Sequence, residues 1–270
     1  MIKKVESTVS FLKEQGIEDA KVGIILGTGL GKLVDSITIE KTIPYNEIPN
    51  FAVSTVESHA GNLIYGSLGG KKVIALQGRF HLYEGYSFSE ITFPVRVLKY
   101  VGIENLLISN AAGAINPTYK KGELMLIEDH INLQGGSPLA EKGIEEFGPR
   151  FVDMIEPYAA SLNYKLKEIA QSNDIKLFEG VYAAVVGPQL ETRAEYRYLK
   201  IIGSDAVGMS TVPEVIVANQ MGLPCAAISV LTDECDPDNL QPINIPEILA
   251  FAAKAEPKLV ELFSNLIEEL

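Results

Sequence analysis

The sequence of 270 residues contains no tryptophan, two cysteines and three histidines. Two cysteines, Cys225 and Cys235, are too few for a disulfide framework, and neither stands in the paired spacing of a zinc site. The histidines His59, His81 and His130 are scattered and show no H-x-x-x-H pattern, so the sequence predicts no metal site. We therefore expect a protein of the reducing cytoplasm that binds no metal.

Positive charge is also scarce, and no apolar run is long and unbroken enough to cross a bilayer. The chain has 23 Lys and Arg against 35 Asp and Glu, a net charge of −12, which disfavours nucleic acids and anionic membranes as partners. The uncharged stretch 215–232 contains Gly222 and Pro224, so it is typical of a helix, a turn and a buried strand. Residues 1–16 carry acids and lysines where an export signal has an apolar core, so we expect no leader.

The sequence is rich instead in short apolar runs that alternate with longer periodic segments, without repeats or a flexible linker. The apolar runs predict strands at 21–27, 63–68, 72–77, 105–109, 124–127, 181–186, 205–208 and 225–231. The periodic segments predict helices near 5–16 and at 89–100, 157–172, 191–202, 212–221 and 246–266. This alternation predicts an α/β fold, with residues 1–270 forming a single domain in which helices flank a central mixed, twisted sheet. Ligands of such sheets bind at the carboxyl ends of the strands.

The loop 27–31, with the sequence GTGLG, follows the first expected strand. Its glycines let the backbone approach an anion closely, and the Thr28 hydroxyl adds a donor, which favours a phosphate loop. The spacing differs from the G-x-G-x-x-G of dinucleotide-binding folds. A tight turn without any ligand is the alternative.

A second loop, 77–85, combines a cation, a histidine and an aromatic hydroxyl. Arg79 and His81 are two residues apart, so both side chains lie on one face of an extended chain, and Tyr83 continues that face. The fork of Arg79 and the ring of His81 suit an anion such as phosphate. A surface arginine beside a structural histidine is the alternative.

Four further loops place small and polar residues at expected strand ends: 109–113, 187–193, 207–214 and 231–234. Glu191 is expected where a strand ends and a helix begins, either as a partner of the helix dipole or as an acceptor in the site. Neither a metal triad nor a G-x-S-x-G nucleophile motif accompanies these loops. The loops therefore predict a common site for a small polar ligand.

Taken together, the motifs GTGLG, SHAGN, QGRFHLYEGY, TFPVRVLKYVG, NAAGAINP, GPQLETRAE and GMSTVPEV closely resemble the trimeric purine nucleoside phosphorylase family of the inosine/guanosine type. The resemblance runs in the same order from about residue 23 to residue 231. It implies reversible cleavage of purine (2′-deoxy)ribonucleosides by inorganic phosphate, which gives a free base and a pentose 1-phosphate. It also implies a homotrimer, small molecules as substrates and no metal or organic cofactor.

The resemblance further implies roles for single residues. Catalytic roles fall to His59, His81, Glu191 and Asp233. Phosphate would be bound by Thr28, Arg79, His81, Ser210 and the backbone amide of Ala111, with His59 as a mobile contact over the phosphate and ribose.

On the nucleoside side, the resemblance implies that Tyr83 and Met209 hold the ribose and that Glu191 accepts the N1–H of a 6-oxopurine. Leu190 stands where the family usually has a phenylalanine against the base. Phe151 matches the aromatic residue that closes the site of the neighbouring subunit, so activity would require the trimer.

Two positions depart from the family pattern. Asp233 replaces an asparagine that donates to the purine, whereas an ionised carboxylate accepts, for example from a 6-amino group. Ile245 replaces a histidine that contacts the 5′-hydroxyl. Both changes point towards adenosine or 5′-methylthioadenosine phosphorylases, but Glu191 would repel the unprotonated N1 of adenine. We therefore expect inosine and guanosine as preferred substrates, with an adenosine or 5′-methylthioadenosine phosphorylase as the alternative.

Two other classes of protein are open to the sequence. A dehydrogenase-like nucleotide-binding module could use the loop 27–31, but the acid that should follow the second strand is missing. A purine-binding homologue without activity is the other alternative. Against it, Arg79, His81, Ser210 and Glu191 are all intact.

Overall fold

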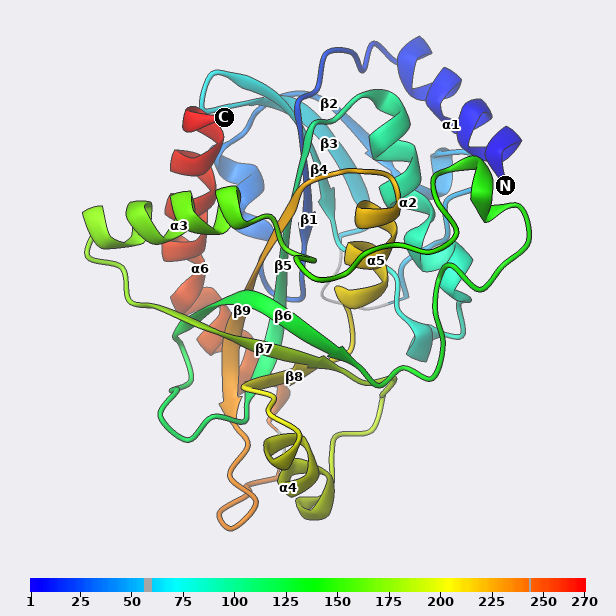
Figure 1. Cartoon of the computed structure of the whole chain (residues 1–270). Coiled ribbons are helices and arrows are strands. Elements are labelled where there is room, and N and C mark those ends of the chain that lie inside the picture. Colours follow the sequence, from blue (N-terminus) through cyan, green and yellow to red (C-terminus); the bar gives the residue numbers. More distant parts are fainter. Residues whose placement is uncertain (56–59, 243) are drawn as a thin grey trace.

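Buried strands form the centre of the molecule, and helices pack on both sides of them (Figure 1). The computed structural model describes residues 1–55, 60–242 and 244–270. The strands are β1 (Val22–Leu26), β2 (Thr38–Pro44), β3 (Asn62–Leu68), β4 (Lys71–Gln77), β5 (Asn105–Ala114), β6 (Leu124–Asn132), β7 (Leu177–Ala184), β8 (Ala206–Gly208) and β9 (Cys225–Glu234). The α-helices are α1 (Ile2–Glu14), α2 (Phe88–Val101), α3 (Ala160–Ser172), α4 (Arg193–Ile201), α5 (Val212–Gln220) and α6 (Ile245–Glu269). None of these helices combines the length and the apolar character that crossing a membrane requires.

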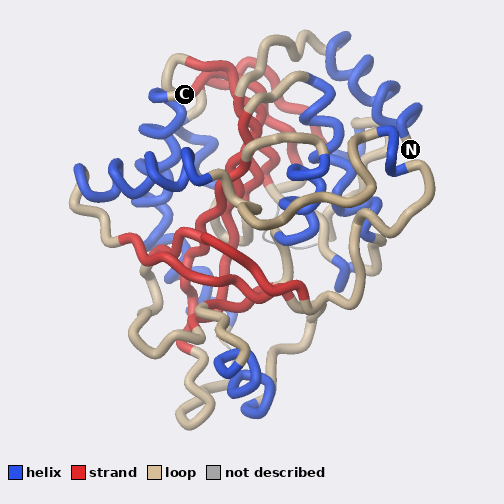
Figure 2. Tube along the Cα trace, in the orientation of Figure 1, coloured by secondary structure: helices blue, strands red, loops and turns tan. Residues whose placement is uncertain are grey.

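The sheet has an open half and a half that closes on itself. Its strand order is β2-β3-β4-β1-β5-β8-β7-β6-β9, and β5 also pairs with β9, so the last five strands form a closed ring of pairings. β1 runs parallel to β4 and β5, whereas β3 is antiparallel to β4 and β6 is antiparallel to β9. The expected α/β fold with a mixed sheet is confirmed, and Figure 2 shows the strands running through the centre between the helices.

Alternate side chains of the central strands pack into two separate apolar layers. Ile25 of β1 belongs to the layer that contains Val97 of α2 and Val215 of α5. Ile24, its neighbour on the same strand, belongs to the layer that contains Leu166 of α3 and residues of α6. Successive side chains of a strand point to opposite faces, so β1 is buried on both faces. This double burial explains why its sequence is apolar throughout rather than alternating.

Three strands continue past the ends of their apolar runs: β5, β6, which reaches Asn132, and β9. β5 continues through residues 110–113, and β9 continues through Asp233 to Glu234. The expectation of loops at these places is wrong. Beyond Ile108, β5 no longer pairs with β1 but continues to pair with β9, and Gly113 and Ala114 also pair with β8. Backbone pairing in the closed half of the sheet therefore sustains these strands where side-chain apolarity ends.

Candidate active site

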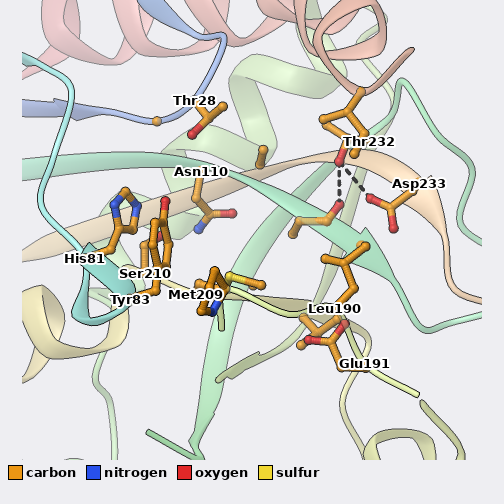
Figure 3. A pocket seen from close by; sticks show the side chains of 18 of the residues that line it. Thr28, His81, Tyr83, Asn110, Leu190, Glu191, Met209, Ser210, Thr232 and Asp233 are labelled. Atoms are coloured by element: carbon orange, nitrogen blue, oxygen red, sulfur yellow. Dashed lines mark hydrogen bonds between the residues drawn. The ribbon is translucent and has the colours of Figure 1, made fainter. Parts of the chain in front are cut away.

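A cavity of about 350 Å³ lies among the ends of several strands and the starts of α5 and α6. The sequence-predicted site residues that line it are Thr28, Arg79, His81, Tyr83, Ala111, Leu190, Glu191, Met209, Ser210, Asp233 and Ile245. Figure 3 shows His81, Tyr83 and Ser210 on one side of Asn110, and Leu190, Glu191 and Asp233 on the other. We call these the histidine end and the carboxylate end. His59 lies outside the described residues, and Phe151 is not among the residues that line this cavity.

Arg79 is buried beside the histidine end and forms an ion pair that was not predicted from the sequence. Its Nη1 donates to Glu214 Oε2 at 3.2 Å and to Ser210 Oγ at 3.1 Å. The same nitrogen donates to Thr211 Oγ1 at 3.0 Å, and Nη2 donates to the backbone oxygen of Ser109. Arg79 and Glu214 are each 4% exposed, so the pair is largely removed from water. The guanidinium of Arg79 thus lines the cavity and also links the segment after β4 to β5 and to the start of α5.

Thr211 has an unusual backbone conformation at the point where the chain enters α5. Its φ of 73° is uncommon for a β-branched residue. The Thr211 hydroxyl accepts hydrogen bonds from Arg79 and, at 2.8 Å, from Asn110 Nδ2. Such a conformation costs about 1–3 kcal/mol and persists where the surroundings enforce it, often at functional sites. Here it places Ser210 at the cavity immediately before α5 begins.

His81 is oriented by an acid on one side and an aromatic ring on the other. Its Nδ1 lies 2.8 Å from Glu84 Oε1, and its ring stacks on Tyr83 with 4.5 Å between ring centres. Burial would raise the pKa of Glu84, but hydrogen bonds from His81 and Thr55 outweigh it and lower that pKa to about 2. Burial also lowers the pKa of His81, although Glu84 opposes this shift. A neutral His81 that donates Nδ1–H to Glu84 would contact a ligand through Nε2.

At the carboxylate end, both oxygens of Asp233 accept hydrogen bonds from the protein. Thr232 Oγ1 donates to Oδ1 at 2.9 Å, and Cys235 Sγ donates to Oδ2 at 3.2 Å. Gly113 makes this arrangement possible, because a Cβ there would lie 2.4 Å from Cys235 Sγ and 3.0 Å from Asp233 Oδ2. Each Asp233 oxygen has a further lone pair, so the side chain can accept a donor from a ligand.

Glu191 lies before α4 rather than at its start. Thr192 caps the helix, since its Oγ1 accepts from the Glu195 amide at 3.2 Å. The expected helix start at residue 191 is therefore wrong, and Glu191 is not the capping residue. Burial raises the pKa of Glu191, and the charge of Asp233 adds to this shift, while a hydrogen bond from Tyr196 opposes it.

Several residues of the site have no assigned role in the sequence analysis: Asn110, Tyr196, Glu214, Thr232 and Cys235. Glu214 was detectable in principle, because it is the one charged residue between Asp205 and Asp233, and a buried arginine needs an acid. Asn110, Thr232 and Tyr196 are polar residues inside strands or a helix, and Cys235 directly follows β9. At such places the sequence pattern does not distinguish a site residue from a structural one. Their positions follow from the extended β5 and β9 and from α4.

The chain is similar to known proteins over nearly its whole length. The sequence profile of the "Phosphorylase superfamily" matches residues 21–268. Purine nucleoside phosphorylase 1 of Geobacillus stearothermophilus is 44% identical over 266 residues, which cover 98% of this chain and 97% of that protein. The purine nucleoside phosphorylase of Mus musculus is 44% identical over 273 residues, covering 98% of this chain and 93% of that protein.

A solved structure shows the same similarity in three dimensions. Isoform 2 of the purine nucleoside phosphorylase from Schistosoma mansoni, in complex with cytosine and ribose-1-phosphate, matches with a TM-score of 0.95 and 42% sequence identity. The match covers 99% of this chain and 96% of that one, so the similarity extends over the whole fold.

Proposed function

We propose a base preference and an assembly for this chain from one premise, that it belongs to the phosphorylase superfamily and, within it, to the purine nucleoside phosphorylases. It is a pentosyltransferase that cleaves purine nucleosides with phosphate. We propose inosine and guanosine, and their 2′-deoxy forms, as preferred substrates. The observation that carries this preference is the Glu191 carboxyl in the cavity, because a 6-oxopurine offers it an N1–H donor whereas adenine N1 is an acceptor.

The histidine end is the proposed phosphate site, with Thr28, Arg79, Ser210 and the Ala111 amide as donors. Cleavage of the glycosidic bond develops positive charge on the ribose and negative charge on the departing purine. A phosphate held against the sugar stabilises the first charge and attacks C1′, so catalysis consists of positioning and electrostatics. Because the pKa of His81 is lowered, its Nε2 can accept the phosphate O–H, which leaves the other phosphate oxygens to the donors of the site.

Two residues favour a second candidate function, the cleavage of adenosine or 5′-methylthioadenosine. Asp233 can accept from a 6-amino group, with Thr232 and Cys235 holding its carboxylate in place. Ile245 lines the cavity together with Ile248, and an apolar surface suits a 5′-methylthio group. We propose these nucleosides as poorer substrates, since Glu191 opposes the adenine base.

We further propose that the reaction needs no metal or organic cofactor, because inorganic phosphate is the nucleophile and a co-substrate. In support, no three His, Cys, Asp or Glu side chains within the described ranges are grouped to hold a metal ion. A cytoplasmic location is proposed because Cys225 and Cys235 are both buried free thiols, as a reducing compartment favours.

A homotrimer is proposed from an exposed apolar loop. Phe151 is 90% exposed and Ile155 is 84% exposed, and large apolar side chains exposed together often mark an interaction site. In the trimer, Phe151 would close the cavity of the neighbouring subunit. Light scattering on the purified protein should give three times the mass of the chain, and Phe151→Ala should raise the nucleoside KM. A fully active monomer would refute this assembly.

The base preference is tested by one assay with four nucleosides. Phosphate-dependent cleavage of inosine, guanosine, adenosine and 5′-methylthioadenosine is measured side by side, with phosphate-free reactions as the control. We expect kcat/KM to be higher for inosine and guanosine than for the two adenine nucleosides. A higher value for adenosine or 5′-methylthioadenosine would overturn the preference and favour the second candidate.

A further inference from the structure

Arg96 of α2 is a buried cation that forms no ion pair with a carboxylate of the described residues. It is 0% exposed, and its Nη1 donates to Gln220 Oε1 at 3.1 Å. Its guanidinium lies 4.5 Å from the centre of the Phe147 ring, while Nε and Nη2 have no hydrogen-bond partner among the described atoms. Burial lowers the pKa of Arg96 to about 10. Burying a cation whose hydrogen bonds are incomplete costs folding free energy. We therefore expect Arg96 to have a role beyond packing.

The partner of Arg96 holds a neighbouring segment of chain. With Oε1 of Gln220 occupied by Arg96, its Nε2 donates to the backbone oxygens of Ile144 at 3.1 Å and Pro149 at 3.3 Å. Gly148 lies against the same residue, because a Cβ there would come within 2.1 Å of the Gln220 backbone oxygen. Residues 144–149 are therefore fixed against the end of α5.

The residue before Gln220 holds the same chain further on. Asn219 Nδ2 donates to the backbone oxygen of Pro157 at 2.8 Å. The loop 150–156 is thus held at both stems by consecutive residues of α5, and Phe151 and Ile155 are exposed between the stems. Figure 1 shows this stretch, between β6 and α3, passing in front of α2 and α5.

We infer that Arg96 and Gln220 are positioning residues that fix the first stem of the loop 150–156 and thereby present Phe151 to the cavity of the neighbouring subunit. This inference rests on the proposed trimer. Neither residue lines the cavity, so their effect passes through the loop. A loop that is ordered before docking loses less conformational entropy when it docks, which should affect nucleoside binding more than the chemical step.

Two variants distinguish the contact between Arg96 and Gln220 from the contacts between Gln220 and the stem of the loop. Gln220→Glu keeps an acceptor for Arg96 but removes the donors to the two backbone oxygens, so it should release the stem without losing the buried cation's partner. Arg96→Met removes the cation and keeps an apolar chain in its place. Thr92→Val is the matched control on α2, because Thr92 is equally buried and its hydroxyl donates to Phe88 of the same helix.

The first readout is hydrogen exchange of the backbone amides of residues 144–151, followed by mass spectrometry. We expect exchange about tenfold faster in Gln220→Glu and Arg96→Met, with the control unchanged, since loosened segments open more often. Unchanged exchange in Gln220→Glu would overturn the inference, whatever the assembly of the protein.

The second readout is steady-state kinetics on variants that light scattering shows to keep the assembly of the wild type. We expect the nucleoside KM to rise about fivefold, as for one side chain that must be ordered on docking, while kcat and the phosphate KM stay within about twofold. In a Phe151→Ala background, Arg96→Met should add nothing. A full additional effect there, or faster exchange with an unchanged nucleoside KM, would contradict the link to the neighbouring cavity. If Phe151→Ala alone has no effect, the proposed trimeric site fails, and the exchange data alone decide whether the stem is held.

Discussion

The two ends of the cavity use charge in opposite ways. At the histidine end, Arg79 forms a buried ion pair with Glu214, and Nδ1 of His81 lies 2.8 Å from Glu84 Oε1. At the carboxylate end, Glu191 and Asp233 are two acids, and burial, together with the charge of Asp233, raises the pKa of Glu191. The histidine end is therefore part of the buried framework, whereas the carboxylate end keeps its acceptors for a ligand.

Substitutions at the two ends of the cavity should therefore have different effects. A change at the histidine end should disturb phosphate binding and stability together, because its charges also hold β4, β5 and α5 in place. A change at the carboxylate end should alter the choice of base and leave the fold intact.

The largest effect is expected from Arg79→Ala. It removes the proposed charge-assisted hydrogen bonds from Arg79 to phosphate, each of which contributes about 1.5–3 kcal/mol. The phosphate KM should therefore rise more than about a hundredfold, while the nucleoside KM changes less. It also leaves Glu214 buried without its partner, which should cost about 3–5 kcal/mol of unfolding free energy. Steady-state kinetics with each substrate varied and thermal denaturation measure the two effects.

A second substitution separates these two effects. Adding Glu214→Gln to Arg79→Ala removes the unpaired buried charge, so stability should partly return while phosphate binding stays weak. Recovery of the phosphate KM together with stability would show that Arg79 acts only as a structural residue.

Glu191→Ala should give the next largest effect. The N1–H of a 6-oxopurine would lose its acceptor, at a cost of about 1–3 kcal/mol, so kcat/KM for inosine should fall about tenfold to a hundredfold. Adenosine cleavage should stay the same or rise, because the carboxylate that opposes adenine N1 is removed. The phosphate KM and the melting temperature should stay as in the wild type. An equal loss for both nucleosides would mean that Glu191 does not recognise the base.

Asp233→Asn should shift selectivity by about tenfold, as expected for one exchanged hydrogen bond at the base. Asparagine can still accept from Thr232 through its Oδ1, but its amide donates where Asp233 accepts. The ratio of kcat/KM for adenosine to that for inosine should therefore fall. A ratio that does not move would show that Asp233 points away from the base.

The smallest effect concerns pH. Because the pKa of Glu191 is raised above its usual value near 4.3, its ionised, accepting form is lost at a higher pH than for an exposed glutamate. As the pH falls from neutral, kcat/KM for inosine should drop before that for adenosine, to whose N1 a protonated Glu191 can donate. Glu191→Gln, which does not titrate, should give a ratio of the two that is independent of pH in this range.

Much of this organisation follows from the sequence alone. Buried apolar runs locate the strands because the central strands are covered on both faces, and GTGLG and QGRFHLYEG lie at the predicted strand ends. The continuation of β5 through residues 110–113 could not be predicted, because it depends on pairing with β9 and β8, which are distant in sequence. Small residues there are as typical of a loop as of a strand packed closely against its neighbours.

The charged residues of the site could likewise be predicted only in part from the sequence. Arg79 and His81 are recognisable from their spacing, and Glu214 stands out as an isolated charge in an apolar segment. That Glu214 pairs with Arg79 could not be predicted, because the pairing depends on how the fold brings α5 close to the end of β4. Gly113 is likewise one of several small residues in the sequence. Only the structure shows that a side chain at this position would clash with Cys235 and Asp233.

The central claim, that Glu191 at the carboxylate end selects 6-oxopurines, is tested most directly by the binding of free bases without catalysis. Isothermal titration of the wild-type protein with hypoxanthine and with adenine, at neutral pH and saturating phosphate, compares the two ligands at one site. We predict that hypoxanthine binds at least about tenfold more tightly, the equivalent of one hydrogen bond to the base, and that Glu191→Ala abolishes this difference. Tighter binding of adenine to the wild type would contradict the account.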